Sequence, residues 1–523
     1  MSLVATAEEK PVAASLEVPA DALPAWVRIS RRGVGMVLFF GATFWVLSWV
    51  PLWYTDLWMH VKYGQWIWAN GLIPRTEPIM SLAEGMPYVD DAWLSQIIMF
   101  GSYWSAGCEG LSLLHTGTVL AIVGVLCAGA YRATNRTWLA LMTLAVLAPL
   151  VWPHLTVVQP KMVGALLFVM LLYMVASRHW HGANWFLIPL LFVCWVNLHG
   201  SFLIGLAVLA CSVLGHTVDA WRQMNRARAG MQGGDLLRWL LVSECAVVAC
   251  LANPYGIEVF ETSLPFPRSA NLETLAIWAP LSVQSWAGIA FAGSILFLVW
   301  LLRMSRRPIA GTEGILLAVF GVASLPHTVS ILWWWLLVPF LYLPHVGVLL
   351  DRYWPRTVHA SIRSFKNTIV AIAMAWIAFA CSAPGSAMIH NKPRSIENVM
   401  SRSTPIETSE YLRQHPPTGQ IFNPVDWGDW LVWHGPADLK CLVTSEIHLI
   451  PEEIWKAYQR IYLGQDDWER TVQGLGIRTI VINKEEQKEL LNQVRLSANW
   501  KIVHEDRLGA IAERLRSGPT RRS

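Results

Sequence analysis

Charged residues are scarce in this chain of 523 residues. Asp, Glu, Lys and Arg make up only 15% of the sequence, whereas hydrophobic residues make up 54%. This balance exceeds what the surface of a soluble globular protein normally allows. A wholly soluble protein is therefore excluded, and the composition predicts a protein whose partner is the lipid bilayer.

The sequence also lacks the patterns of a cysteine-based metal site and of a nucleic-acid-binding surface. The eight cysteines form no CxxC pair and no metal-ligand spacing, so nothing indicates a metal centre built on cysteine. Cys108 and Cys441 both fall in segments expected outside the membrane, but nothing in the sequence brings them together, and we expect them to be unpaired. The net charge of +4 comes from Arg residues between the apolar segments, and no basic, aromatic-rich surface follows. We therefore expect no nucleic-acid partner.

Long apolar segments dominate instead. Crossing about 30 Å of hydrocarbon takes roughly 20 helical residues, and the chain offers about eleven candidates of slightly varying length. The sequence thus predicts a mostly α fold, a polytopic transmembrane helix bundle. The expected spans are 33–53, 111–131, 138–152, 162–177, 185–197, 201–218, 239–251, 286–302, 314–325, 329–350 and 368–382.

The positions of Lys and Arg predict the orientation. If the N-terminus is cytoplasmic, the outside loops between spans contain only Lys62, Arg75, Lys161 and Arg268, and the other cations of the membrane region lie inside. We expect a multi-pass protein of the bacterial inner membrane with an odd number of spans. Its parts are a cytoplasmic tail (1–32), a membrane domain (33–382) with a large first outside loop (54–110), and a periplasmic α/β domain (383–523).

Acidic residues lie in that first outside loop, next to the membrane boundary. Asp56 and His60 are one helical turn apart, so both could face one site; alternatively they only cap and solvate an interfacial helix. Asp90 and Asp91 precede a second helix in the same loop. That pair could serve the same site or could be an N-cap acid at the positive end of a helix dipole.

Short runs along the chain resemble a known superfamily. They are DLWMH from Asp56 to His60, PRT from Pro74 to Thr76, AWL from Ala92 to Leu94, WVNLHG from Trp195 to Gly200, NPYG from Asn253 to Gly256, and WGDWL from Trp427 to Leu431. These runs resemble bacterial polytopic proteins related to the GT-C glycosyltransferases. That superfamily includes protein mannosyltransferases, the aminoarabinose transferases that modify lipid A, and oligosaccharyltransferases.

The resemblance implies a membrane enzyme that moves a sugar from a polyprenyl-phosphate-linked donor to an acceptor outside the cytoplasm. It places the functional acid after the first span at Asp56, and a second acid of the loop at Asp91, with Asp90 beside it. One departure is visible, because Asp91-Ala92 stands where relatives have His-Glu before Trp-Leu. The departure moves the carboxylate along the chain.

Such a transfer needs a base for the acceptor proton and a positive group or metal for the leaving phosphate. Our catalytic candidates are Asp56 as the base, with His60, Asp90 and Asp91. Asp56 and Asp91 could instead bind a divalent cation, Mg or Mn, through oxygen ligands. The candidates for binding the substrate are Lys161, Arg268, His199, Asn197 and His327.

Two of these candidates have structural alternatives. Lys161 could simply extend its ammonium to the interface from a helix end. His199 could make a hydrogen bond that ends a helix.

The C-terminal part alternates between short strands and amphipathic helices, which predicts a small α/β domain. The expected strands are 420–422, 441–444, 479–482, 501–504 and 508–512, and the expected helices are 408–414, 452–463, 468–475 and 485–496. This part contains no GxGxxG, P-loop or nucleophile elbow, so we expect acceptor binding or capping of the membrane site. Asp426, Asp429 and Trp430 could contact a sugar, or they could form an Asp-rich turn.

A noncatalytic or transport-type membrane protein is the alternative function. A transporter usually places polar residues at mid-bilayer and often contains repeated halves. This chain has its acids at the outside boundary, and we find no internal repeat. The enzyme is favoured.

Overall fold

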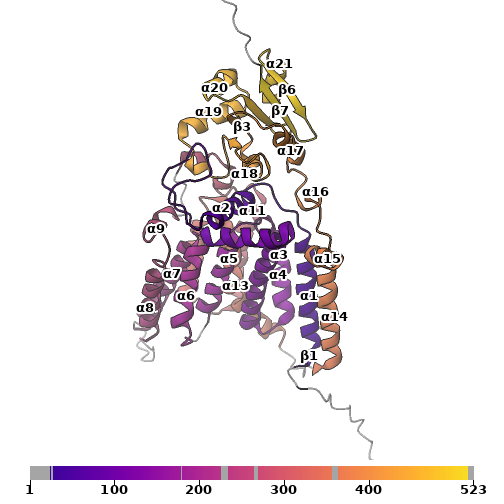
Figure 1. The fold of residues 1–523 in the computed structure, drawn as a ribbon. Coiled ribbons are helices and arrows are strands. Elements are labelled where there is room, and N and C mark those ends of the chain that lie inside the picture. Colours follow the sequence, from indigo (N-terminus) through magenta and orange to yellow (C-terminus); the bar gives the residue numbers. More distant parts are fainter. Residues whose placement is uncertain are drawn as a thin grey trace, which may run out of the picture.

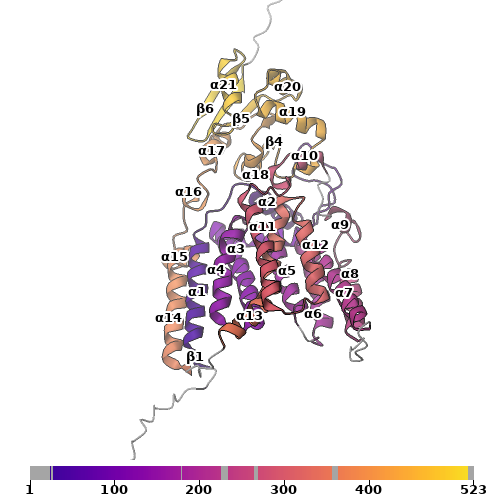
Figure 2. The same ribbon diagram turned by 180° about the vertical axis from the view of Figure 1, so that it is seen from behind.

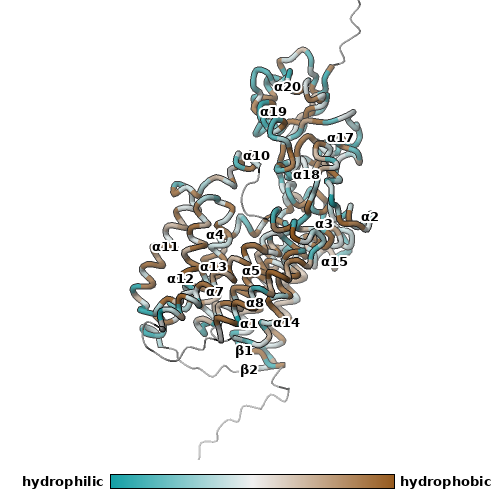
Figure 3. The backbone as a smooth tube through the Cα atoms, turned by 90° about the vertical axis from the view of Figure 1, so that its left-hand side faces the viewer, coloured by the Kyte–Doolittle hydropathy of each residue, from teal (hydrophilic) through white to brown (hydrophobic). Residues whose placement is uncertain are grey.

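The computed structural model describes residues 24, 27–177, 180–224, 234–263, 269–355 and 363–515. Helices account for 66% of the described residues, and most of them form a bundle with a smaller C-terminal domain above one end (Figure 1). Apolar residues cover the bundle, whereas the C-terminal domain is mixed (Figure 3). This contrast matches a membrane part and a water-exposed part.

Every one of the eleven expected spans coincides with a helix. The bundle consists of α1 (Arg31–Ser48), the second half of α3 (Trp93–Thr134), α4 (Thr137–Leu155), α5 (Lys161–Val175), α6 (Asn184–Leu198), α7 (Phe202–Met224), α8 (Gly234–Ala249), α11 (Trp286–Ser305), α12 (Gly311–Ala323), α13 (Ile331–Tyr353) and α14 (Phe365–Cys381).

Five of these helices are long and apolar enough to cross a membrane on their own. α14 makes a sixth if it is combined with α15 (Ala383–His390), from which it is bent by 81°. α5, α6 and α12 are apolar but shorter. The bundle is therefore multi-pass, and the count of eleven spans stays a prediction.

The helices of the bundle differ in the share of their residues that is buried. α13 is the most enclosed span, with 78% of its apolar window buried, whereas α11 has 17% buried. Leu296 on α11 is 71% exposed, as expected of a side chain that faces lipid. Figure 2 shows α1 and α14 side by side at one edge of the bundle.

The first outside loop forms a platform across the top of the bundle (Figure 1). α3 breaks at Ala106 and Gly107, where Gly107 has a φ of 59°, so its first half turns away from the bundle. This half packs against α2 (Leu57–Asn70). A Cβ on Gly64 would lie 2.1 Å from the carbonyl oxygen of Gln96, so only glycine allows the two helices to approach this closely.

The C-terminal domain contains a five-stranded sheet in the order β4-β3-β5-β7-β6. β3 pairs in parallel with β4 and β5, and β7 pairs antiparallel with β5 and β6. The strands are β3 (Gln420–Phe422), β4 (Lys440–Cys441), β5 (Thr479–Asn483), β6 (Trp500–Glu505) and β7 (Gly509–Arg514), and the helices are α17 (Ile406–Gln414), α18 (Val425–His434), α19 (Glu452–Tyr462), α20 (Trp468–Gly474) and α21 (Lys488–Leu496). The C-terminal part thus contains a small sheet together with helices, as the sequence predicted.

One helix of this domain is a correction to the sequence prediction. The Asp-rich turn is in fact α18, which begins after Pro424. Trp427, Trp430 and Leu431 are all buried, and their i, i+3, i+4 spacing puts them on one helix face. Along the sequence, Asp426 and Asp429 alternate with the apolar residues, and this concealed the helix.

The remaining described elements are short. They are β1 (Ile29–Ser30), β2 (Arg363–Ser364), α9 (Glu258–Thr262), α10 (Ala270–Glu273), η2 (Ala276–Trp278), η3 (Thr328–Ser330), α16 (Ile396–Val399) and η4 (Ile447–Leu449).

Several contacts hold the C-terminal domain against the platform. The chain before α2 pairs with the segment between α15 and α17, here called the linker. Leu52 donates its N–H to Val399 O and accepts from Ser401 N–H, each at 2.9 Å. A buried ion pair joins Arg394 in the linker to Glu109, with Nε–Oε1 at 2.7 Å. The linker is thus attached near both ends of the first outside loop. Cys108 and Cys441 are both free thiols, as expected.

Candidate functional site

Asp56 stands in an unusual backbone turn at the start of α2. Its φ and ψ are 61° and −59°, and Leu57 N–H donates to Thr55 O at 2.6 Å across it. This is a γ-turn with positive φ, which is rare and strained for a residue other than glycine. The Asp56 side chain makes no capping hydrogen bond to α2, so helix capping does not explain the carboxylate.

His60 connects Asp56 with the second half of the loop. Burial lowers the pKa of His60, and the Asp56 charge opposes that shift. Its Nδ1 lies 3.4 Å from Nε2 of Gln96, and the same Nε2 donates to Asp90 Oδ1 at 2.9 Å. His60 therefore lies between the two groups of acids that the sequence singled out.

Asp90 is the buried member of the acidic pair. It is 3% exposed, and its Oδ1 also accepts from Ala92 N–H at 3.0 Å, while Oδ2 has no hydrogen-bond partner among the described residues. Burial raises the pKa of Asp90 to about 8, and the Asp91 charge adds to the rise. Asp90 is consequently mostly protonated at neutral pH.

Asp91 lies against the turn between α6 and α7. Its Oδ2 accepts from Ser263 Oγ at 3.4 Å. A Cβ on Gly200 would lie only 2.0 Å from the same Oδ2, so residue 200 must be glycine for the carboxylate to occupy this position. The fold thereby brings the WVNLHG run against the first loop.

His199 and Lys161 supply the polar groups on the bundle side. His199 Nδ1 accepts from Ser201 N–H at 3.0 Å, which leaves the ring proton on Nε2. Burial, with the charges of Lys161 and His60, lowers the pKa of His199 to about 3. The Lys161 ammonium lies within electrostatic reach of Asp56 and His199, so the bundle faces the acids with one cation and one neutral donor.

Two other predicted ligands have different surroundings. Asn197 donates to Val193 O and Ala252 O and accepts from Trp93 Nε1, which ties α6 to α3 beside Asp91. His327 contacts the carbonyl of Trp278 through Nδ1 at 2.9 Å, and thus lies against η2. Arg268 lies outside the described residues.

Three further acids interact electrostatically with these groups, and sequence reasoning had singled out only Asp429 among them. Glu77 is 1% exposed and accepts from Tyr63 Oη at 2.7 Å. Burial, with the charges of Glu77 and Asp429, raises the pKa of Glu446 well above its ordinary value. Burial raises the pKa of Asp429 to about 7, and Asp56 adds to this. Glu77 and Glu446 belong to no motif, so no local signal could have found them.

The sequence also allowed a divalent cation at these acids. Within the described part of the chain, no three His, Cys, Asp or Glu side chains are placed to hold one metal ion. Oδ1 of Asp90 accepts two hydrogen bonds, and Oδ2 of Asp91 lies against Gly200. The Mg or Mn site that the sequence allowed at Asp56 and Asp91 stays a prediction.

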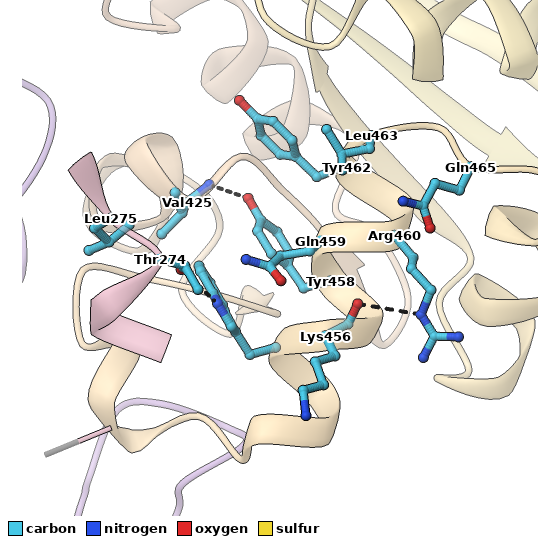
Figure 4. Close-up of a pocket in the computed structure, with 11 residues that line it drawn as sticks. Thr274, Leu275, Val425, Lys456, Tyr458, Gln459, Arg460, Tyr462, Leu463 and Gln465 are labelled. Atoms are coloured by element: carbon cyan, nitrogen blue, oxygen red, sulfur yellow. Dashed lines mark hydrogen bonds between the residues drawn. The ribbon is translucent and has the colours of Figure 1, made fainter. Parts of the chain in front are cut away.

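A hollow of about 680 Å³ opens elsewhere, on the C-terminal domain along α19 (Figure 4). Its aromatic residues are engaged internally: Trp455 Nε1 donates to Thr274 Oγ1, and Tyr458 Oη accepts from Val425 N–H. None of the candidate site residues lines it. The acids and Lys161 thus remain the chemical centre.

Comparisons with known proteins agree with this architecture. No protein-family model matches the chain, and no curated protein does. The crystal structure of ArnT from Cupriavidus metallidurans bound to undecaprenyl phosphate is similar, with a TM-score of 0.51 and 15% identity over 93% of this chain and 99% of that chain. The apo structure of that protein has a TM-score of 0.44 and 14% identity over the same shares. The chain described here therefore has the fold of the ArnT structure that contains undecaprenyl phosphate.

Proposed function

We propose that this chain is a glycosyltransferase of the bacterial inner membrane, which transfers a sugar from a polyprenyl-phosphate-linked donor to an acceptor on the periplasmic side. The observation that best supports this proposal is the strained backbone turn at Asp56. The Asp56 carboxylate lies within electrostatic reach of Lys161 at one end of the bundle. A similar fold holds undecaprenyl phosphate in the ArnT structure, which supports a lipid phosphate as the donor's carrier.

The chemistry divides between the two sides of the site. Asp56 accepts the proton of the acceptor hydroxyl as its oxygen forms a bond to the anomeric carbon. The bond between that carbon and the phosphate oxygen breaks, and the lipid phosphate leaves with the electron pair. Lys161 and the Nε2–H of His199 stabilise the charge on the leaving phosphate.

The alternative is a noncatalytic or transport-type protein with the same fold. Backbone strain of order 1–3 kcal/mol persists where the surrounding structure enforces it, commonly at active sites. Asp56 combines that strain with a carboxylate that caps no helix. This combination favours the enzyme.

A reconstituted assay tests the proposal. Purified protein in liposomes is given undecaprenyl-phosphate-linked hexoses and aminoarabinose together with cell-envelope glycolipids, and the release of undecaprenyl phosphate is measured. Asp56→Asn should lower the rate by roughly a hundredfold or more, whereas Asp438→Asn, an exposed acid of the C-terminal domain, should not change it. Full activity of Asp56→Asn would exclude the role of Asp56, and inert wild-type protein would favour the noncatalytic alternative.

A further inference from the structure

The C-terminal domain reaches the Asp56 turn through one side chain. Asp429 on α18 accepts the backbone N–H of Asp56 with Oδ2 at 2.6 Å. Its Oδ1 accepts Ser445 N–H at 2.9 Å. The carboxylate is 1% exposed, so both bonds form away from bulk water, where the low dielectric strengthens a hydrogen bond.

The bonded N–H belongs to the residue whose backbone is strained. Rotation about φ of Asp56 moves this N–H relative to the carboxylate on the same residue. A bond that restrains the N–H therefore also restrains the direction of the Asp56 side chain. The γ-turn bond from Leu57 to Thr55 closes the turn from the other side.

Asp429 itself is held rigidly. The neighbouring Trp430 packs edge-on against Trp58 of α2, with ring centroids 5.2 Å apart, and donates its Nε1–H to Ser409 at 3.0 Å. Trp433 stacks on the same Trp58 at 5.8 Å. Because Trp58 is fully buried, α18 and α2 form one packed unit around the Asp429–Asp56 bond.

We propose that Asp429 is a positioning residue: it holds the Asp56 turn so that the Asp56 carboxylate faces the Lys161 side of the site, and transfer depends on this contact with the C-terminal domain. The inference rests on the proposed function of Asp56. The inference gives the C-terminal domain a role beyond capping the membrane site. Removal of the buried Asp429 carboxylate, 373 residues away in sequence, should disturb the candidate base Asp56.

Asparagine at position 429 is the sharpest perturbation. It keeps the size of the side chain but replaces one acceptor oxygen with an NH2 group. Both oxygens of Asp429 accept from backbone N–H groups. The NH2 group of an asparagine side chain must therefore point at one of these two N–H donors, which it cannot bind. Asp426→Asn is the matched control, because Asp426 lies on the same helix but is exposed.

Two measurements separate this proposal from the proposed function. Hydrogen–deuterium exchange of the peptide covering residues 53–60 should become roughly tenfold faster in Asp429→Asn and stay unchanged in Asp426→Asn. In the transfer assay Asp429→Asn should lower kcat by roughly ten- to a hundredfold with little change in KM, at an unchanged Tm. In an Asp56→Asn background it should add no further loss.

Each outcome is decisive. Unchanged exchange in a folded Asp429→Asn protein overturns the positioning role, as does an unchanged kcat. Loss of activity that accompanies a lower Tm in equal measure shows a merely structural role. Faster exchange together with a wild-type protein that is inert toward every sugar donor retains the contact and rejects the proposed function.

Discussion

Replacing Asp90 with asparagine should stabilise the protein, and the gain should depend on pH. Asp90 is buried, and its hydrogen-bond donors, Ala92 N–H and Gln96 Nε2, are neutral. Burial raises its pKa from 3.8 to about 8. Since the native state then binds a proton that the unfolded chain has lost, the stabilising contribution is complete below pH about 4 and is lost as pH rises through 8.

The size of the effect follows from this pKa. A rise from 3.8 to about 8 corresponds to roughly 6 kcal/mol at most. Asparagine does not titrate, its oxygen can accept the same two bonds, and its NH2 group replaces Oδ2, which has no partner among the described residues. The advantage of Asp90→Asn should therefore be near zero at pH 4, grow up to pH 8, and stay constant above it.

Apparent Tm values in detergent between pH 4 and 9 measure this difference, and transfer assays at pH 7 accompany them. Asp438→Asn is the control for the loss of one negative charge, because Asp438 is exposed. A Tm difference that is independent of pH would refute the reasoning from burial. Loss of transfer in a folded Asp90→Asn protein would show that the Asp90 charge acts in the chemistry, as the sequence candidates allowed.

Two further predictions concern the platform and the topology. Gly200→Ala places a Cβ 2.0 Å from Asp91 Oδ2 and 2.8 Å from Ser263 Oγ, so the rate of transfer should fall by roughly tenfold or more. The control is Gly182→Ala, whose Cβ meets no atom within 4 Å and which should not change the rate. Equal activity of the two variants would remove Asp91 from the site. A reporter fused to the C-terminus should be active only in the periplasm and one at the N-terminus only in the cytoplasm, and activity of both on the same side would contradict the odd number of spans.

Much of the fold follows from local sequence patterns. Hydrophobic segments of membrane length and the 3.6-residue period of amphipathic helices depend only on neighbours in the chain. For this reason all eleven apolar segments appear as helices, and the strands of the C-terminal domain lie close to their expected positions. Asp56 was found in the same way, because an acid directly after the first span is conspicuous.

Sequence patterns predicted the structure less well where polar residues are buried among apolar ones. α18 was expected to be a turn, since Asp426 and Asp429 interrupt the run of apolar residues in the sequence. β4 is shorter than expected, at Lys440–Cys441. From the sequence, Asp91 was the second acidic position of the loop, with Asp90 beside it. Only the packing of α3 buries Asp90 and turns Asp91 toward Gly200.

The sequence by itself thus determined that the chain is a helical membrane protein with a small α/β domain and an acid at the boundary of the first span. Tertiary structure alone decided what surrounds that acid. The bond from Asp56 to Asp429 and the proximity of Glu77 to Glu446 join segments separated by hundreds of residues. No local period or motif encodes such contacts, because they depend on how the platform and the C-terminal domain pack together.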